Sequence, residues 1–201
     1  PRQLHSSSFG YLCVAETPEG AACGLVTNLA LMATVRVGFP SQCLLEPLLA
    51  AGAQPFKVDA EGVVVLLNGS PAARLADGMT ADAFALHLRE RRRNGELPIE
   101  TSIGIEEGDI VISSDAGALI RPVVVASRWK LFQSTVEEDR RRPGLFYGGI
   151  WEELVRRGCI EWIDPLEQRC ARVALWPNHL SETMPGKSAF THLELHPALA
   201  L

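Results

Sequence analysis

The stretch that decides the fold runs from residue 2 to residue 28 and reads RQLHSSSFGYLCVAETPEGAACGLVTN. Within it, residues 11–14 are typical of a short strand, and ETPEG at 16–20 is typical of a turn. A rigid Pro-Glu-Gly turn backed by a buried strand holds a carboxylate and backbone amides in fixed positions, and Arg2 is long enough to reach a phosphate beside it. The residues alone allow a plain structural turn or a ligand site, and they favour the turn.

The size and charge of the chain limit what it does. With 201 residues, 47% of them hydrophobic and 21% charged, it is large enough for one or two small packed domains. Apolar runs such as 29–32 and 63–67 are far shorter than the roughly 20 residues of a membrane span, so no membrane partner is expected. The net charge of -5 argues against binding nucleic acid alone. Because Pro1 replaces a starting Met and residues 198–201 lack a cap, we expect an internal fragment.

The periodicity of apolar residues indicates a mixed α+β fold, rich in strands and with several short helices. The clearest helix follows Thr80, carries apolar residues at 81, 84, 85 and 88, and ends near Gly95. Further helices are expected at 43–51 and 150–155, and residues 130–142 read as a solvated helix or a surface connection that ends at Pro143-Gly144. Expected strands are 63–67, 99–105, 110–113, 119–125, 160–163, 171–176 and 191–195.

Several details of the strands and cysteines are also predicted. Strands 99–105, 110–113 and 119–125 should form an antiparallel meander, with a hairpin turn at 115–117 and with Pro122 away from a central strand. Residues 29–37 read as a strand or a buried helix. The cysteines are odd in number and form no Cys-x-x-Cys pair, so we expect buried free thiols and no zinc; they are Cys13, Cys23, Cys43, Cys159 and Cys170.

No motif for stand-alone catalysis is present, such as a phosphate-binding loop, a nucleophile elbow or a His-Glu-x-x-His helix. His192, Glu194 and His196 alternate as on one strand face, which allows a metal site but favours a solvated face. The arginine runs at 89–93 and 140–142 allow phosphate contacts but favour solvated surface.

Longer strings of residues point to a family. Arg2-Gln3-Leu4-His5, the AETPEG sequence at 15–20, ACGLV at 22–26 and NLALM at 28–32 together resemble the fork region of the second-largest, β-like subunit of multisubunit DNA-directed RNA polymerases. SDAG at 114–117 with Arg121-Pro122, and FTHLELHP at 190–197, resemble later motifs of the same family. The forms at both ends resemble the eukaryotic type, RNA polymerase II, or the enzymes of large DNA viruses.

The resemblance implies a place in a larger enzyme that makes RNA by template-dependent nucleotidyl transfer. Residues 1–40 would belong to the fork beside the active centre, 41–128 to the first part of the external domain, and 129–201 to its second part. The implied partners are the largest subunit, other polymerase subunits, DNA template, RNA–DNA hybrid and nucleoside triphosphates. The implied location is the nucleus, or for a viral homologue the cytoplasm or virion.

The resemblance also implies roles for single residues. Glu19, Arg2 and Gln3 would lie near the incoming nucleotide, and His5, Glu16 and Gly20 would support the turn. The enzyme's Mg2+ ions would be held mainly by the largest subunit, so this fragment alone would be inactive. Ala21 and Ala118 depart from the family's usual Gln and Arg, which puts the contacts of those positions in question.

Two other functions remain open from the residues alone. One is a stand-alone nucleic-acid-binding module without catalysis, which the acidic balance disfavours. The other is a small metalloenzyme that uses His192, Glu194 and His196.

Overall fold

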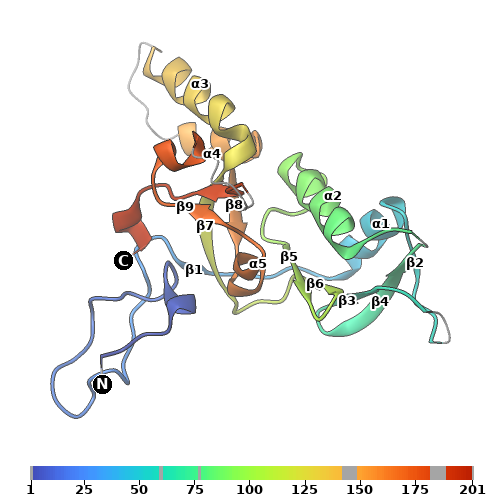
Figure 1. Cartoon of the computed structure of the whole chain (residues 1–201), viewed down its shortest axis with the longest axis horizontal. Helices are drawn as coiled ribbons and strands as arrows, with labels where there is room; N and C mark the ends of the chain where they lie inside the picture. Colours follow the sequence, from blue (N-terminus) through green and yellow to red (C-terminus); the bar gives the residue numbers. More distant parts are fainter. Residues whose placement is uncertain (1, 59–60, 77, 142–148, 182–188, 201) are drawn as a thin grey trace.

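The chain folds into two five-stranded sheets with short helices around them, as the computed structural model shows (Figure 1). The structure describes residues 2–58, 61–76, 78–141, 149–181 and 189–200, and in these ranges no helix is long and apolar enough to cross a membrane. The predicted mixed α+β class is therefore confirmed.

The first sheet is built from residues close together in the sequence. Its strands lie in the order β2 (Ala53–Pro55), β4 (Ser70–Leu75), β3 (Val64–Leu67), β6 (Asp109–Ser113) and β5 (Ser102–Glu106). All neighbours are antiparallel except β3 and β6, which are parallel. Helices α1 (Gln42–Ala50) and α2 (Ala81–Arg93) lie against it (Figure 1) and enclose a core that includes Leu48, Phe84, Leu88, Ile103 and Ile110.

Helix α2 confirms the clearest prediction from the sequence. The Thr80 hydroxyl accepts a hydrogen bond from the Ala83 N–H at 3.3 Å, which satisfies one of the free donors at the helix start. Gly95 has a φ of 81° beyond the end of the helix, a conformation that glycine tolerates without strain. Phe84 and Leu88 are almost fully buried, and burial of each stabilises the fold by roughly 1.5–3 kcal/mol.

The second sheet is built from distant parts of the chain around one central strand. Strand β7 (Leu119–Val125) pairs antiparallel with β1 (Thr34–Val35), β8 (Ile160–Ile163) and β10 (His192–Leu193). Strand β9 (Val173–Ala174) adds to β10 in parallel. Helices α3 (Trp129–Arg140) and α4 (Ile150–Arg156) lie beside this sheet, and α5 (Pro165–Arg169) lies between the two sheets (Figure 1).

Two predictions about β7 are wrong. Strands β5 and β6 do pair as expected, but β3 occupies the other side of β6, so β7 joins the second sheet and the 115–117 turn is no hairpin. Pro122 lies within the central strand, opposite Trp162. Along a central strand, successive residues direct their backbone hydrogen bonds alternately to the strand on one side and to the strand on the other. The N–H that Pro122 lacks therefore removes at most one hydrogen bond of the sheet, which a central strand tolerates.

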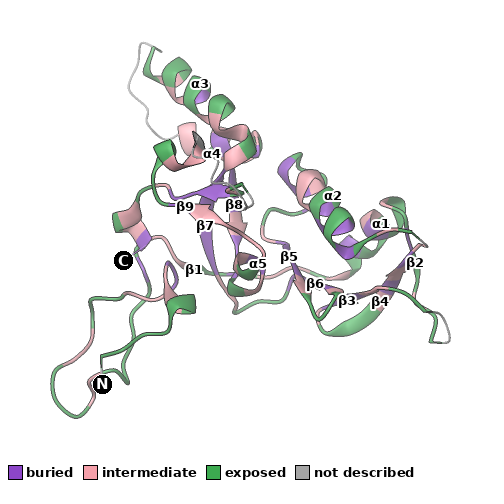
Figure 2. Ribbon diagram, viewed as in Figure 1, coloured by how far each residue is buried: buried purple, intermediate pink, exposed green. Residues whose placement is uncertain are grey.

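The N-terminal part has little regular structure and much exposed surface (Figure 2). It contains a short 3-10 helix at Ser6–Ser8 and a single bridge between Leu12 and Leu29, so the strand predicted at 11–14 is reduced to that bridge. The long apolar element predicted at 29–37 is wrong, since only β1 forms. Ala30 and Arg36 are the buried residues there. The Arg36 guanidinium lies 3.2 Å from the Asp164 carboxylate, while Val37 is 81% exposed.

The remaining predictions are mostly confirmed, with shorter elements than expected. Residues 130–142 take the helical option as α3, and the predicted end at Pro143-Gly144 lies outside the described residues. Strands β9 and β10 are two residues each, shorter than predicted. All five cysteines are free, but Cys159 is the one that is buried and Cys43 is exposed, so the prediction of buried thiols holds for one position.

Candidate functional site

The structure brings most of the predicted site residues to one cavity in the N-terminal part. This cavity, of about 250 Å³, is lined by residues 2–4, by residues 13–17, which include Glu16, by Glu19, and by Gly24, Val26 and Thr27. His5 and Gly20 lie outside its lining. Four of the six predicted residues thus line one cavity, and the two outside its lining are ones predicted only to support the turn.

Arg2 and Glu19 form an ion pair at this cavity. The Arg2 Nη2 atom lies 3.3 Å from Glu19 Oε1, and the side chains are 60% and 89% exposed. Arg2 Nε also donates to the Cys23 Sγ atom at 3.4 Å. Because water screens an exposed pair, it contributes at most about 1 kcal/mol to folding. Both charged groups are thus accessible to an added ligand at little loss of stability.

The loop that carries Glu19 is closed at a narrow base. The Cys13 N–H donates to the Asn28 carbonyl at 2.9 Å, and the Ala30 N–H donates to the Tyr11 carbonyl at 3.0 Å. Within the loop, the Gly24 N–H donates to the Thr17 hydroxyl at 2.8 Å. These bonds fix residues 14–27 as one loop, which we call the Glu19 loop.

The two weaker candidates have local structural roles. His5 Nδ1 accepts a hydrogen bond from the Ser7 N–H at 3.2 Å and so caps the short 3-10 helix. Gly20 has a φ of 94° with open space around its α-carbon, which suits the turn that follows Pro18-Glu19.

A second cluster, which the sequence did not predict, joins the two sheets. We call it the charged junction; its members are Arg92, Arg93, Glu161, Glu167 and His192. Arg92 donates to Glu167 at 2.6 and 2.8 Å and to Glu161 at 2.9 Å. Arg93 donates to both Glu161 oxygens at 2.7 and 2.9 Å, and His192 Nε2 lies 2.5 Å from Glu161 Oε1. The predicted solvated surface at 89–93 is therefore wrong for Arg92 and Arg93, which are buried.

Electrostatics in the junction favour the charged carboxylate. Burial alone raises the pKa of Glu161, but the Arg92 and Arg93 guanidinium groups and the His192 hydrogen bond outweigh it. The pKa of Glu161 therefore lies well below its usual range. The neighbouring carboxylates likewise raise the pKa of Arg92 against the opposing effect of burial. All the buried ions are thus paired, as a stable interior requires.

The three residues of the alternative metal site face different partners. His192 contacts Glu161, Glu194 accepts two hydrogen bonds from Arg121 at 2.8 and 2.9 Å, and the His196 ring packs edge-on against Trp176 at 6.0 Å. The predicted solvated face is wrong, because His192 and Glu194 are buried. In the described part of the chain no group of three or more His, Cys, Asp or Glu side chains is placed to hold a metal ion.

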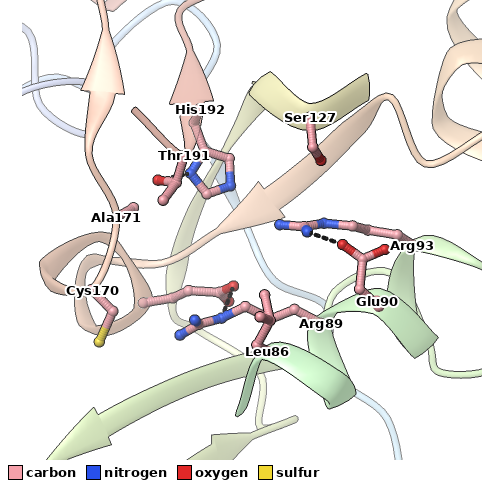
Figure 3. Close-up of a pocket in the computed structure, with 10 residues that line it drawn as sticks. Leu86, Arg89, Glu90, Arg93, Ser127, Cys170, Ala171, Thr191 and His192 are labelled. Atoms are coloured by element: carbon pink, nitrogen blue, oxygen red, sulfur yellow. Dashed lines mark hydrogen bonds and ion pairs between the residues drawn. The ribbon is translucent and has the colours of Figure 1, made fainter. Parts of the chain in front are cut away.

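A further cavity of about 240 Å³ opens beside the charged junction (Figure 3). Arg89 and Arg93 line it from α2. On the opposite side it is lined by His192 of β10, in the second sheet, and by the preceding residue Thr191. Arg89 is engaged by the Ile103 carbonyl and by Glu167 at 3.2 Å, and Arg93 by Glu90 and Glu161. The ionic groups of this cavity are therefore already paired within the protein.

The fold and the site define a class of protein before any relative is considered. Two small sheets are joined by buried ion pairs, and the exposed Arg2–Glu19 pair lies at the polar cavity of the N-terminal part. This combination defines a packed α+β structural module with an exposed ion pair at a polar cavity.

The sequence comparisons identify the family. Residues 1–35 match RNA polymerase Rpb2, domain 3, residues 65–127 match RNA polymerase Rpb2, domain 4, and residues 151–197 match RNA polymerase Rpb2, domain 5. The chain belongs to the Rpb2 family of RNA polymerase subunits, which confirms the resemblance found in the sequence.

Relatives of this chain come from eukaryotes and archaea. DNA-directed RNA polymerase II subunit RPB2 of Encephalitozoon cuniculi is 36% identical over 220 residues, and DNA-directed RNA polymerase II subunit 2 of Arabidopsis thaliana is 31% identical over 217; both cover 100% of this chain. Subunit Rpo2 of Saccharolobus solfataricus is 32% identical over 212 residues and covers 96%. The chain spans 18% of the length of each of these relatives.

Proposed function

We propose that this chain works as part of a DNA-directed RNA polymerase, in which it forms a wall near the active centre during template-dependent RNA synthesis. The observation that carries the proposal is the exposed Arg2–Glu19 pair at a polar cavity, inside the segment that matches Rpb2 domain 3. The relatives, which are subunits of DNA-directed RNA polymerases, support the same role. On its own, the chain would not synthesise RNA.

In this proposal the Glu19 loop contributes charge and hydrogen bonds at the nucleotide. Arg2 donates to a phosphate or ribose of the incoming nucleotide, and Gln3 lies beside it. A desolvated charged hydrogen bond of this kind is worth about 1.5–3 kcal/mol. Glu19 adjusts the negative charge near the nucleotide-bound metal without being a principal ligand, and His5, Glu16 and Gly20 hold the turn.

The rest of the active site lies outside this chain. Magnesium ions held mainly by the largest subunit would stabilise the attacking and leaving oxygens of nucleotidyl transfer. The chain's own polar residues orient the substrate and shape its surroundings.

We also propose a domain assignment and a setting. Residues 1–40 form the fork, 41–128 the first part of the external domain, and 129–201 its second part. The partners are the largest and other polymerase subunits, with DNA template, RNA–DNA hybrid and nucleoside triphosphates bound by the assembly. Relatives that are RNA polymerase II subunits support a nuclear location, and a viral homologue would act in the cytoplasm or virion.

The test is Glu19→Ala in the assembled polymerase. We expect assembly to be unchanged and the KM for nucleoside triphosphate, or the elongation rate at low nucleotide, to change about fivefold, which is the effect of roughly 1 kcal/mol between two charges about 4 Å apart in water. Glu137→Ala is the matched control, because Glu137 is also exposed and only loosely paired, 3.9 Å from Arg141. Equal elongation kinetics for both variants across nucleotide concentrations would contradict the proposal.

A further inference from the structure

Three sequence motifs that lie far apart in the chain meet at one side chain, Arg121. Its Nη1 atom donates to both oxygens of Glu194, from the 190–197 motif, at 2.8 and 2.9 Å. Its Nε atom donates to the Gln168 side chain at 2.7 Å. Arg121 is buried, with 3% of its surface exposed, so these bonds hold the guanidinium in one position.

The N-terminal part rests on this fixed guanidinium through two residues. The Arg121 guanidinium carbon lies 5.7 Å from the centre of the buried Tyr11 ring, within the range of a cation–π contact. Gly10 lies so close that a β-carbon at this position would be 2.6 Å from the Cδ and Nε atoms of Arg121. Since Glu194 and Gln168 hold Arg121, the guanidinium cannot move aside for a larger residue at position 10.

Backbone and hydroxyl bonds fix the same contact from the other side. The Gly10 N–H donates to the Ala200 carbonyl at 3.2 Å, and the Tyr11 hydroxyl donates to the Ile163 carbonyl at 3.2 Å. Gly10 and Tyr11 therefore join the N-terminal part to the second sheet. Little other regular structure holds this part in place, because residues 2–33 contain only the short 3-10 helix and one bridge.

The contact leads directly to the base of the Glu19 loop. Tyr11 accepts the Ala30 N–H through its carbonyl, and Cys13, two residues later, bonds Asn28 across the loop base. The orientation of this base sets where the loop stands relative to the second sheet. Arg121 itself does not line the cavity that holds Arg2 and Glu19, and Gly10 and Tyr11 connect it to the base of the loop.

We propose that Arg121 is a positioning residue for the polymerase reaction: it clamps Gly10 and Tyr11 and thereby sets the placement of the Glu19 loop beside the nucleotide. The proposal rests on the proposed function for its kinetic consequence, but the clamp itself is a property of the fold. Under this proposal the Arg121-Pro122 motif and the 190–197 motif act together. Glu194 holds Arg121 in place, and Arg121 in turn holds Gly10 and Tyr11.

The first test perturbs the clamp from both sides in the assembled polymerase. Arg121→Lys keeps the charge but loses the planar fork that bonds Glu194 and Gln168. Gly10→Ala leaves Arg121 in place and inserts a methyl group against it. The matched controls are Arg169→Lys, which changes an arginine that is 71% exposed, and Gly108→Ala, whose φ of 92° brings the same backbone strain but whose β-carbon meets nothing within 4 Å.

The structural readout is hydrogen exchange of the Cys13 and Ala30 amides, which close the loop base. We expect both clamp variants to exchange at least about tenfold faster there than the controls, the equivalent of about 1.4 kcal/mol. Unchanged exchange in both clamp variants would overturn the proposal.

The kinetic readout separates positioning from general weakening. We expect Arg121→Lys to raise the KM for nucleoside triphosphate about fivefold, and to add no further rise in a Glu19→Ala background, because both changes act on one loop. Effects that multiply in the double variant would overturn the positioning role. If Glu19→Ala alone leaves the KM unchanged while the clamp variants speed exchange, the proposed function fails and the clamp stands.

Discussion

The charged junction allows a quantitative prediction through Glu161→Gln. Glu161 is 3% exposed and accepts hydrogen bonds from Arg92 and from two nitrogens of Arg93, with His192 at 2.5 Å. The substitution preserves the shape of the side chain but removes its charge. It also replaces one acceptor oxygen by an NH2 group, which then faces nitrogen donors and cannot bond them.

The expected loss of folding free energy is large. Removing one partner from a buried ion pair costs about 3–5 kcal/mol, because the remaining charges stay buried without compensation. Two arginines lose their shared carboxylate here, and Arg93 keeps only the partly exposed Glu90. The effect is therefore expected in the upper half of that range, a large part of the roughly 5–15 kcal/mol stability of a typical domain.

The assay is denaturant unfolding of the 201-residue chain followed by tryptophan fluorescence. The control is Glu106→Gln, which removes a carboxylate that is 53% exposed and pairs with Arg169 at 3.2 Å; a loss of at most about 1 kcal/mol is expected. If Glu161→Gln costs no more than Glu106→Gln, the reasoning about buried charge is wrong.

The pH dependence supplies an independent check of the same reasoning. The pKa of Glu161 is lowered in the folded state, so its stabilising effect is complete above the unfolded value of about 4.3 and is lost as the pH falls through the folded value. The stability difference between the natural chain and Glu161→Gln should therefore shrink as the pH falls below about 4.3. A stability difference between the two chains that grows as the pH falls would contradict the prediction.

Two further predictions concern a glycine and a pair of cysteines. Gly158→Ala should destabilise the chain far more than Gly95→Ala in thermal unfolding, since both have positive φ but only a β-carbon at 158 would collide with the Arg93 carbonyl; similar melting temperatures would contradict this. Cys43 should react quickly with a thiol reagent, while Cys159, which is buried and whose pKa burial raises, should react only on unfolding, as timed labelling with mass spectrometry would show.

Local patterns predicted what local interactions determine. Helix α2 was predicted in full because its cap, apolar spacing and glycine stop all lie within sixteen residues of each other, from Thr80 to Gly95. The Arg2–Glu19 cluster was predicted because a family resemblance links its members, although His5 and Gly20 lie outside the cavity.

Long-range pairing explains what the sequence did not reveal. The buried carboxylates that pair with Arg92 and Arg93 lie 68 to 75 residues away, so an arginine run typical of a helix surface conceals a buried junction. One signal was available: position 92 continues the apolar stripe of Phe84 and Leu88 at helical spacing. A charged residue on such a stripe indicates a buried ion pair.

The two sheets differ in when their parts become available during synthesis. The first sheet and its two helices need only residues 42–113, which form one contiguous stretch of chain. Strand β7 in contrast meets partners from residues 34–35 and from residues 192–193, so its neighbours span nearly the whole chain. Because domains fold as the ribosome releases them, the first sheet would be complete before β8 and β10, which pair with β7, have been synthesised. Until then β7 exposes an apolar strand, and that interval is when the nascent chain is most open to misassembly.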